Sequence, residues 1–189
     1  YIARFEVVHT NIYARIDSYI NTIKNTGVFL IYDFSNLWTE KQLEQVCPHL
    51  DIAFFSLGHM EDDEAQRFLR SVRMYADCLL VGTLGPRGVV VLDGQTLYHE
   101  GPYTIPGNKK DTLGAGDSFI AGFSLPYADG LSYLNRTVRD CAPPHHQDVA
   151  RFRSALIRNA IACGNLRAVK ACMTDGAFGH GVPAPTLNL

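Results

Sequence analysis

The sequence lacks the segments that would direct a protein to a membrane or to nucleic acid. No apolar run approaches the roughly 20 residues that a membrane-spanning helix needs, and the chain does not open on a charged and then apolar signal peptide. Basic runs are absent too, since 17 lysines and arginines face 19 acidic residues and the formal net charge is -2. We therefore expect no membrane and no nucleic acid among the partners.

Cysteine is scarce and irregularly placed. The five cysteines stand at positions 47, 78, 141, 163 and 172, a spacing that fits neither a disulfide framework nor a zinc pattern. Cys141 lies near His145 and His146, but the adjacent Pro143-Pro144 pair favours a solvated loop over a metal site. A reducing cytoplasm is the expected location.

Hydrophobic residues make up 47% of the 189 residues, which is enough for the core of one globular domain. Apolar runs of strand length alternate with helical patterns, and Asp93-Gly94 marks a hairpin turn. This alternation of strands and helices predicts an α/β fold with a mostly parallel sheet. The expected strands cover residues 5–9, 28–32, 52–55, 78–81, 89–92 and 96–99, and the expected helices cover residues 12–24, 39–46, 62–75, 118–128, 148–163 and 166–174, with a loop over residues 137–147.

The segment Asp111-Thr-Leu-Gly-Ala-Gly-Asp117 carries the clearest chemical signal. Gly114, Ala115 and Gly116 have almost no side-chain bulk, so their backbone N–H groups can approach an anion. An apolar helical pattern follows, which places these amides at a helix N-terminus, where a phosphate is favoured. Asp117 would then stand beside the phosphate as a general base. In the alternative interpretation, Asp117 only caps the helix and the glycines only form a turn.

This segment resembles the Asp-Thr-x-Gly-Ala-Gly-Asp signature of the ribokinase-like, or PfkB-type, carbohydrate kinases. The resemblance implies a layered αβα fold and ATP-dependent phosphorylation of a sugar hydroxyl. By the same resemblance, Gly114, Ala115 and Gly116 form the anion hole for the transferring phosphoryl group, and Asp117 takes the proton from the sugar.

Further segments are similar to the nucleotide-contacting parts of that family. A Thr-x-Gly-x-x-Gly segment precedes the hairpin, a glycine-rich turn closes the chain, and a helix between them carries an asparagine. Taken alone, the Thr-x-Gly-x-x-Gly segment would be interpreted as an ordinary strand-to-strand turn. The resemblance assigns nucleotide binding to Thr83, Gly85, Gly88, Asn165, Gly176, Ala177 and Gly179.

Asp33 follows a strand and opens an Asp-Phe-Ser-Asn-Leu-Trp segment. Together with the strand at residues 5–9, this segment looks like the fructoselysine 6-kinase branch of the family, which implies a substrate contact for Asp33 and a sugar or fructosamine substrate. An Asx turn at the strand end is the alternative.

The metal ligands do not follow the family pattern. Many members carry Asn-x-x-Glu after the third strand, where this chain reads Ser56-Leu-Gly-His-Met-Glu61. ATP and Mg²⁺ are still implied, but the Mg²⁺ ligands remain unknown. Asp62, Asp63 and Glu64 match the acidic first turn of a helix better than a metal site. Some relatives hold a potassium ion near the position of Asp111.

The resemblance covers the rear part of a typical family member, without its lid and its front strands. The chain also begins at Tyr1 rather than at Met, so we expect a fragment or a processed form. We expect one ribokinase-like domain over residues 1–189, with an insertion at residues 133–154 and with a homodimer as the candidate assembly. The alternative is a non-catalytic kinase remnant that binds nucleotide or a partner chain.

Overall fold

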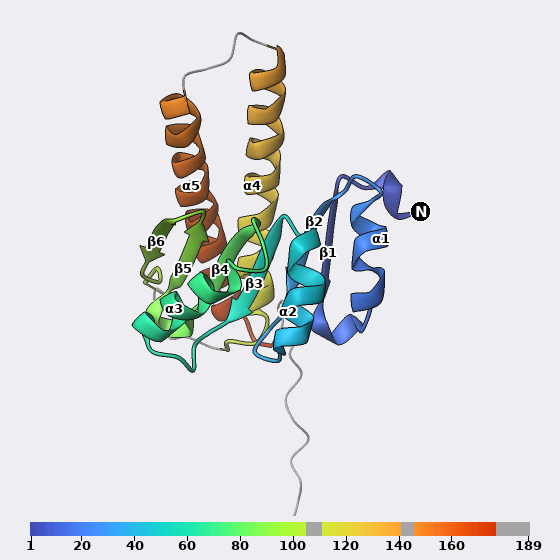
Figure 1. Cartoon of the computed structure of the whole chain (residues 1–189). Coiled ribbons are helices and arrows are strands. Elements are labelled where there is room, and N and C mark those ends of the chain that lie inside the picture. Colours follow the sequence, from blue (N-terminus) through green and yellow to red (C-terminus); the bar gives the residue numbers. More distant parts are fainter. Residues whose placement is uncertain (105–110, 141–145, 177–189) are drawn as a thin grey trace, which may run out of the picture. The chain divides into compact units, whose positions relative to one another are not determined.

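The structure is a computed structural model that describes residues 1–104, 111–140 and 146–176. The chain forms two compact units, Tyr1–Pro102 (unit 1) and Tyr103–Leu189 (unit 2). Figure 1 labels their helices and strands. The expectation of a single domain stays a prediction.

Unit 1 is built on a six-stranded sheet whose strands follow one another in chain order. The first four strands are parallel, and the last two add antiparallel neighbours through the predicted hairpin. Gly94 makes the hairpin turn with a φ of 56°. The strands are β1 (Val7–Asn11), β2 (Phe29–Asp33), β3 (Ile52–Ser56), β4 (Leu79–Thr83), β5 (Val89–Asp93) and β6 (Thr96–Glu100).

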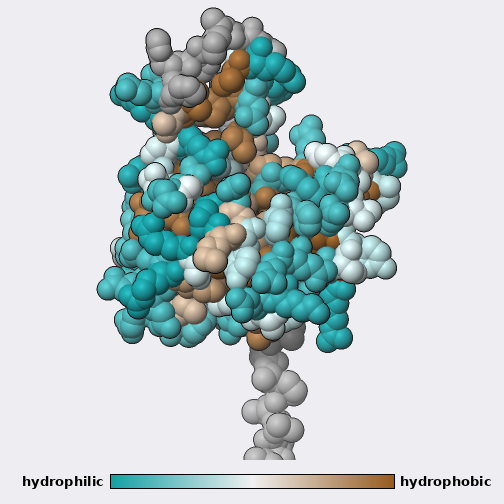
Figure 2. Space-filling model, viewed as in Figure 1, coloured by the Kyte–Doolittle hydropathy of each residue, from teal (hydrophilic) through white to brown (hydrophobic). Residues whose placement is uncertain are grey.

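Helices α1 (Ile20–Lys24), α2 (Glu40–Val46) and α3 (Asp62–Val72) pack their apolar sides into one core with β2 to β5. Helix α2 begins where the sequence predicts, because Thr39 and Gln42 form a reciprocal capping box. Figure 2 shows hydrophilic side chains over most of the face that α2 and α3 present. Short 3₁₀ turns complete the unit at η1 (Ile2–Arg4), η2 (Ile12–Ala14), η3 (Asp17–Tyr19), η4 (Cys47–His49) and η5 (Gly85–Arg87).

The expected helix over residues 12–24 is wrong for most of its length. Asn11 caps η2 by accepting a hydrogen bond from the Ala14 N–H, and Arg15 then adopts left-handed backbone angles, φ 54° and ψ 39°. A left-handed residue ends a right-handed helix, so the chain turns again through η3 before α1 begins. The amphipathic pattern predicted the burial of Ile20 and Ile23, which are 0% and 6% exposed, but not the break in the backbone.

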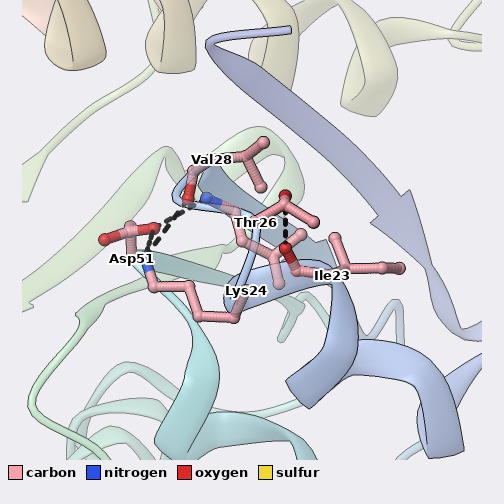
Figure 3. A network of polar contacts seen from close by, with 6 residues as sticks. Ile23, Lys24, Thr26, Val28 and Asp51 are labelled. Carbon is pink, nitrogen blue, oxygen red and sulfur yellow. Dashed lines mark hydrogen bonds and ion pairs between the residues drawn. The ribbon is translucent and has the colours of Figure 1, made fainter. Parts of the chain in front are cut away.

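A polar network fastens α1 to the sheet (Figure 3). The Lys24 ammonium forms an ion pair with Asp51 and also donates to the Val28 carbonyl. Asp51 Oδ2 accepts a 2.7 Å hydrogen bond from the Leu30 N–H as well. Since Asp51 directly precedes β3 and Leu30 lies in β2, this carboxylate ties the starts of two neighbouring strands together.

The described part of unit 2 contains two long helices, α4 (Ala115–Asp140) and α5 (His146–Cys172), which lie side by side in Figure 1. Small residues allow the close approach: a Cβ atom on Gly122 would lie 2.8 Å from the Cys163 carbonyl oxygen, and one on Gly164 would lie 2.7 Å from the Phe119 ring. The expected loop over residues 137–147 is therefore helical at both ends, and the two expected helices at residues 148–174 are one continuous helix.

Candidate active site

The signature segment forms a turn that leads directly into α4. Asp111 Oδ1 accepts hydrogen bonds from the N–H groups of Thr112 and Leu113, at 2.6 and 3.0 Å. Gly114 has a φ of 76°, a conformation that side chains other than glycine rarely adopt. The Ala115 N–H donates to the Thr112 carbonyl at 3.1 Å, and α4 begins at this residue. The side chain of Asp111 thus organises the turn.

The anion-hole residues and the expected base stand in the first turn of α4. Gly116 and Asp117 are exposed, and a Cβ atom added to Gly116 would meet nothing within 4 Å. Among the described residues, the Asp117 carboxylate has no hydrogen bond or ion pair. Asp117 is the third residue of the helix, so it does not occupy the cap position of the alternative interpretation. The exposed Gly116 and the Asp117 carboxylate are therefore accessible to a ligand, whereas the Ala115 N–H is engaged by the Thr112 carbonyl.

Asn165 lies on α5 beside the closely packed Gly164 and is only 6% exposed. A groove of about 570 Å³ is lined by residues of both α4 and α5, among them Ser118, Arg167 and Lys170. Arg167 and Lys170 give no signal in the sequence, because isolated basic residues on a helix form no motif. Gly176 is half-buried. The predicted Ala177 and Gly179 lie outside the described residues.

In unit 1, the predicted Thr-x-Gly-x-x-Gly segment forms the end of β4 and the turn η5. The Leu84 N–H donates to the Gly88 carbonyl at 2.8 Å, and Thr83 Oγ1 donates to the Phe55 carbonyl at 3.4 Å. Gly85 and Gly88 have φ angles of 60° and 100°, which explains the two glycines of the motif by backbone geometry. The nucleotide contact expected for Thr83, Gly85 and Gly88 stays a prediction.

Arg87, in the same turn, reaches the segment that replaces the family's Asn-x-x-Glu. Its guanidinium pairs with Asp62 and donates to the Met60 carbonyl. Asp62 lies in the acidic first turn of α3, as the sequence predicts. Its partner Arg87 gives this carboxylate a structural role. The described part of the chain contains no group of three or more His, Cys, Asp or Glu side chains that could hold a metal ion. Mg²⁺ ligands therefore cannot be assigned to it.

Asp33 ends β2 at the carboxyl edge of the sheet, where α/β proteins bind ligands. Its Oδ1 accepts a 2.8 Å hydrogen bond from the Ser35 N–H, so the Asx turn is present. Ser35 has a φ of 52° and its Oγ lies 3.1 Å from the Tyr13 hydroxyl. The turn does not exclude a substrate contact, because a carboxylate has further acceptor positions.

The predicted site residues fall into two groups, each described within its own unit. Unit 1 holds Asp33, Thr83, Gly85 and Gly88, all at or just beyond the carboxyl ends of β2 and β4. Unit 2 holds Asp111, the Gly114 to Asp117 segment, Asn165 and Gly176. Over the described ranges, no helix combines the length and the apolarity needed to cross a membrane.

Sequence comparison defines the class of protein. The model of the pfkB family of carbohydrate kinases matches residues 20–141, and the chain belongs to that family. Two relatives indicate which members of the family the chain is similar to. It is 28% identical to the fructosamine kinase of Bacillus subtilis (strain 168) over 97% of this chain and 55% of the relative, and 31% identical to the fructoselysine 6-kinase of Shigella flexneri over 70% of this chain and 49% of the relative. The chain thus spans about half the length of the relatives it matches.

Solved structures show the same fold. A microbiome-derived acarbose kinase aligns with a TM-score of 0.68 at 23% identity, over 93% of this chain and 52% of that one. The ribokinase of Giardia lamblia aligns with a TM-score of 0.69 at 14% identity, over 93% of this chain and 56% of that one. The expected ribokinase-like α/β fold and the resemblance to the fructoselysine 6-kinase branch are confirmed.

Proposed function

We propose that this chain carries the nucleotide-binding and catalytic portion of an ATP-dependent kinase for a sugar or sugar-amine hydroxyl. The observation that supports the proposal is the Asp111 to Asp117 signature, which begins α4 within the segment that the family model matches. ATP supplies the transferring phosphoryl group. Thr83, Gly85, Gly88, Asn165, Gly176, Ala177 and Gly179 would contact the nucleotide.

In this mechanism the first turn of α4 supplies positioning and charge stabilisation. The amides of Gly114, Ala115 and Gly116 would donate to the oxygens of the transferring phosphoryl group, where negative charge is spread in the transition state. For this, the Ala115 N–H would exchange its hydrogen bond to the Thr112 carbonyl for one to a phosphoryl oxygen. The Asp117 carboxylate accepts the proton of the attacking hydroxyl, which increases the nucleophilicity of that oxygen. The exposed position of Asp117 leaves this carboxylate accessible to substrate.

The names of the relatives favour a fructosamine such as fructoselysine as the acceptor. Asp33, at the carboxyl edge of the sheet, would contact it. Mg²⁺ would accompany ATP, and we propose K⁺ near Asp111 as an activator, so activity should be higher in potassium than in sodium. We further propose a cytoplasmic protein that forms a homodimer.

A second candidate is a non-catalytic remnant that binds nucleotide or a partner chain. The observation that favours it is the Ser56 to Glu61 segment, which stands where many family members carry Asn-x-x-Glu. The two candidates differ in whether Asp117 matters for turnover.

A chimera tests the proposal. The N-terminal half of the Shigella flexneri relative is joined to residues 1–189, and ADP release is measured over a panel of sugars and fructosamines. We expect turnover with fructoselysine, and Asp117→Asn should lower kcat by at least about 100-fold while ATP affinity changes little. Asp129→Asn, another exposed carboxylate on α4, serves as the matched control and should be neutral. A variant that keeps more than a tenth of the rate would exclude Asp117 as the base.

A further inference from the structure

Unit 1 contains a second candidate binding surface, a pocket of about 580 Å³ just beyond the carboxyl end of β1. Its volume is within the range of about 300–1,000 Å³ that is usual for small-molecule sites. The chemical character is mixed, since a cation, a carboxylate, a phenol and two amides surround it. The lining residues that matter here are Tyr13, Arg15, Asp17, Ser18, Gln42 and Gln45.

Arg15 supplies the positive charge. It is exposed and, within the described part of the chain, its guanidinium has neither a hydrogen bond nor an ion pair. Its backbone is left-handed, with a φ of 54°, a conformation that is unfavourable for a side chain of this kind. A guanidinium without a partner that lines a pocket is suited to a carboxylate, which it binds through two parallel hydrogen bonds.

Asp17 supplies the negative charge in a fixed position. Its Oδ1 accepts a 2.6 Å hydrogen bond from the Tyr32 hydroxyl, and its Oδ2 accepts one of 3.1 Å from Gln42 Nε2. A carboxylate offers about four acceptor positions, so both oxygens can still accept from an ammonium group. The pocket therefore presents one positively and one negatively charged group together.

The pocket is joined to the edge where Asp33 stands. Tyr13, which lines it, is in hydrogen-bond contact with Ser35 at 3.1 Å, and the Ser35 N–H donates to Asp33. A ligand that contacts Asp33 would therefore have the pocket as its neighbour at the same sheet edge.

We propose that this pocket binds the amino-acid part of a sugar-amine substrate, with the α-carboxylate on Arg15 and the α-ammonium on Asp17. The inference rests on the proposed function, because it assigns a place to the part of fructoselysine that a plain sugar lacks. A zwitterionic α-amino acid supplies an opposite charge to both Arg15 and Asp17, whereas a neutral sugar supplies a charged partner to neither. Arg15 would then determine specificity for fructosamines over sugars.

Ligand binding to the 189-residue chain tests this inference without any phosphoryl transfer. The probes are fructoselysine, fructose, free lysine, and fructoselysine with its α-carboxylate converted to an amide, each titrated by NMR or calorimetry. We expect fructoselysine to bind more tightly than lysine, lysine more tightly than fructose, and the amide at least about tenfold more weakly than fructoselysine. Fructose binding as well as fructoselysine, or no binding of either fructoselysine or lysine, would overturn the proposal.

Arg15→Gly is the decisive variant. It removes the guanidinium and at the same time relieves the left-handed backbone, so the variant should unfold at the same temperature as the parent or higher. We expect at least about tenfold weaker binding of fructoselysine and unchanged binding of its amide. Arg70→Ala, an exposed arginine on α3, is the matched control. If Arg15→Gly weakened the binding of fructoselysine and of its amide equally, the Arg15–carboxylate contact would be disproved. The kinase mechanism is tested separately, by the turnover of Asp117→Asn.

Discussion

The Tyr32 hydroxyl donates a 2.6 Å hydrogen bond to Asp17 Oδ1, and this bond links the middle of the sheet to the turn that follows β1. Tyr32 lies in β2 and is fully buried, while Asp17 lies in η3 and lines the pocket. Burial, and secondarily the bond to Asp17, raises the pKa of the Tyr32 hydroxyl above its ordinary value. The neutral phenol is therefore the stable donor that holds this carboxylate in place.

Tyr32→Phe should lower the free energy of unfolding by about 1–3 kcal/mol, because it removes the donor and keeps the ring in the core. Tyr13→Phe is the matched control. Its hydroxyl contact with Ser35 is exposed, and the loss should be under about 0.5 kcal/mol. Urea unfolding followed by circular dichroism measures both values. Equal losses would show that the Asp17 bond adds no stability.

The second glycine of the Thr-x-Gly-x-x-Gly segment should be far less tolerant of substitution than the first. A Cβ atom on Gly88 would lie 2.1 Å from the Glu100 carbonyl oxygen, and the residue has a φ of 100°. Gly88→Ala should therefore cost about 3 kcal/mol or more. Gly85→Ala should cost only about 1 kcal/mol, because its φ is 60° and no atom lies within 4 Å. Thermal unfolding measures the stability of both variants. A loss in Gly85→Ala as large as that in Gly88→Ala would contradict the prediction.

Stability should fall at alkaline pH through two buried thiols. Burial raises the pKa of Cys78 from 9.0 to about 12 and also raises the pKa of Cys47. The unfolded chain therefore releases these protons first, and the free energy of unfolding decreases as the pH rises from about 9 towards 12. Below pH 9 both states hold the protons and this contribution is constant. In Cys78→Ala the decline measured by urea unfolding should be shallower; an identical decline would contradict the assignment to this thiol.

The sequence predicts the sheet of unit 1 well, because its signals are local. Continuous apolar runs mark β2 to β5, Asp93-Gly94 marks the hairpin, and the helix expected at residues 39–46 matches α2. Asp33 at a strand end follows from the same pattern. The signature segment likewise predicts the beginning of α4 within three residues of the structure.

The failures have tertiary causes. Gly164 interrupts the helical pattern in the sequence, yet the structure keeps α5 continuous because the missing side chain makes room for the Phe119 ring. The pocket at Arg15 and Asp17 was missed because the amphipathic pattern of residues 12–24 hides a left-handed residue. The Asn11 cap was the one available signal, since asparagine after a strand favours a new turn.

Gly116→Val should separate the anion hole from folding. The added side chain meets no atom of the described chain within 4 Å of its Cβ position, so the variant should fold, but it crowds the amides that would receive a phosphate. In the chimera we expect a higher KM for ATP and a kcat lowered by at least about tenfold. Gly122→Ala is the contrasting variant, because its Cβ would lie 2.8 Å from the Cys163 carbonyl and should destabilise the helix pair. Normal kinetics in a folded Gly116→Val variant would rule out the anion hole.

In the 189-residue chain alone, β1 forms one edge of the described sheet. Val7 and Val8 are half-buried on this strand, and an edge strand with apolar residues is a template for pairing with another chain. We expect concentration-dependent oligomers in size-exclusion chromatography, and kinase activity at background with every sugar tested.

His9→Lys places a charge at the exposed position of the same strand and should shift the chain towards monomer, since lysine on an edge opposes strand addition. Lys41→Arg on α2 keeps the charge and leaves the edge unchanged, so it serves as the control. A monodisperse, monomeric parent chain would show that β1 does not pair with a second copy of the chain. Sugar-dependent ADP release from the same 189 residues would contradict the second expectation. It would show that these residues alone hold a sugar hydroxyl in line with the γ-phosphate, and this alignment provides a large part of the rate acceleration.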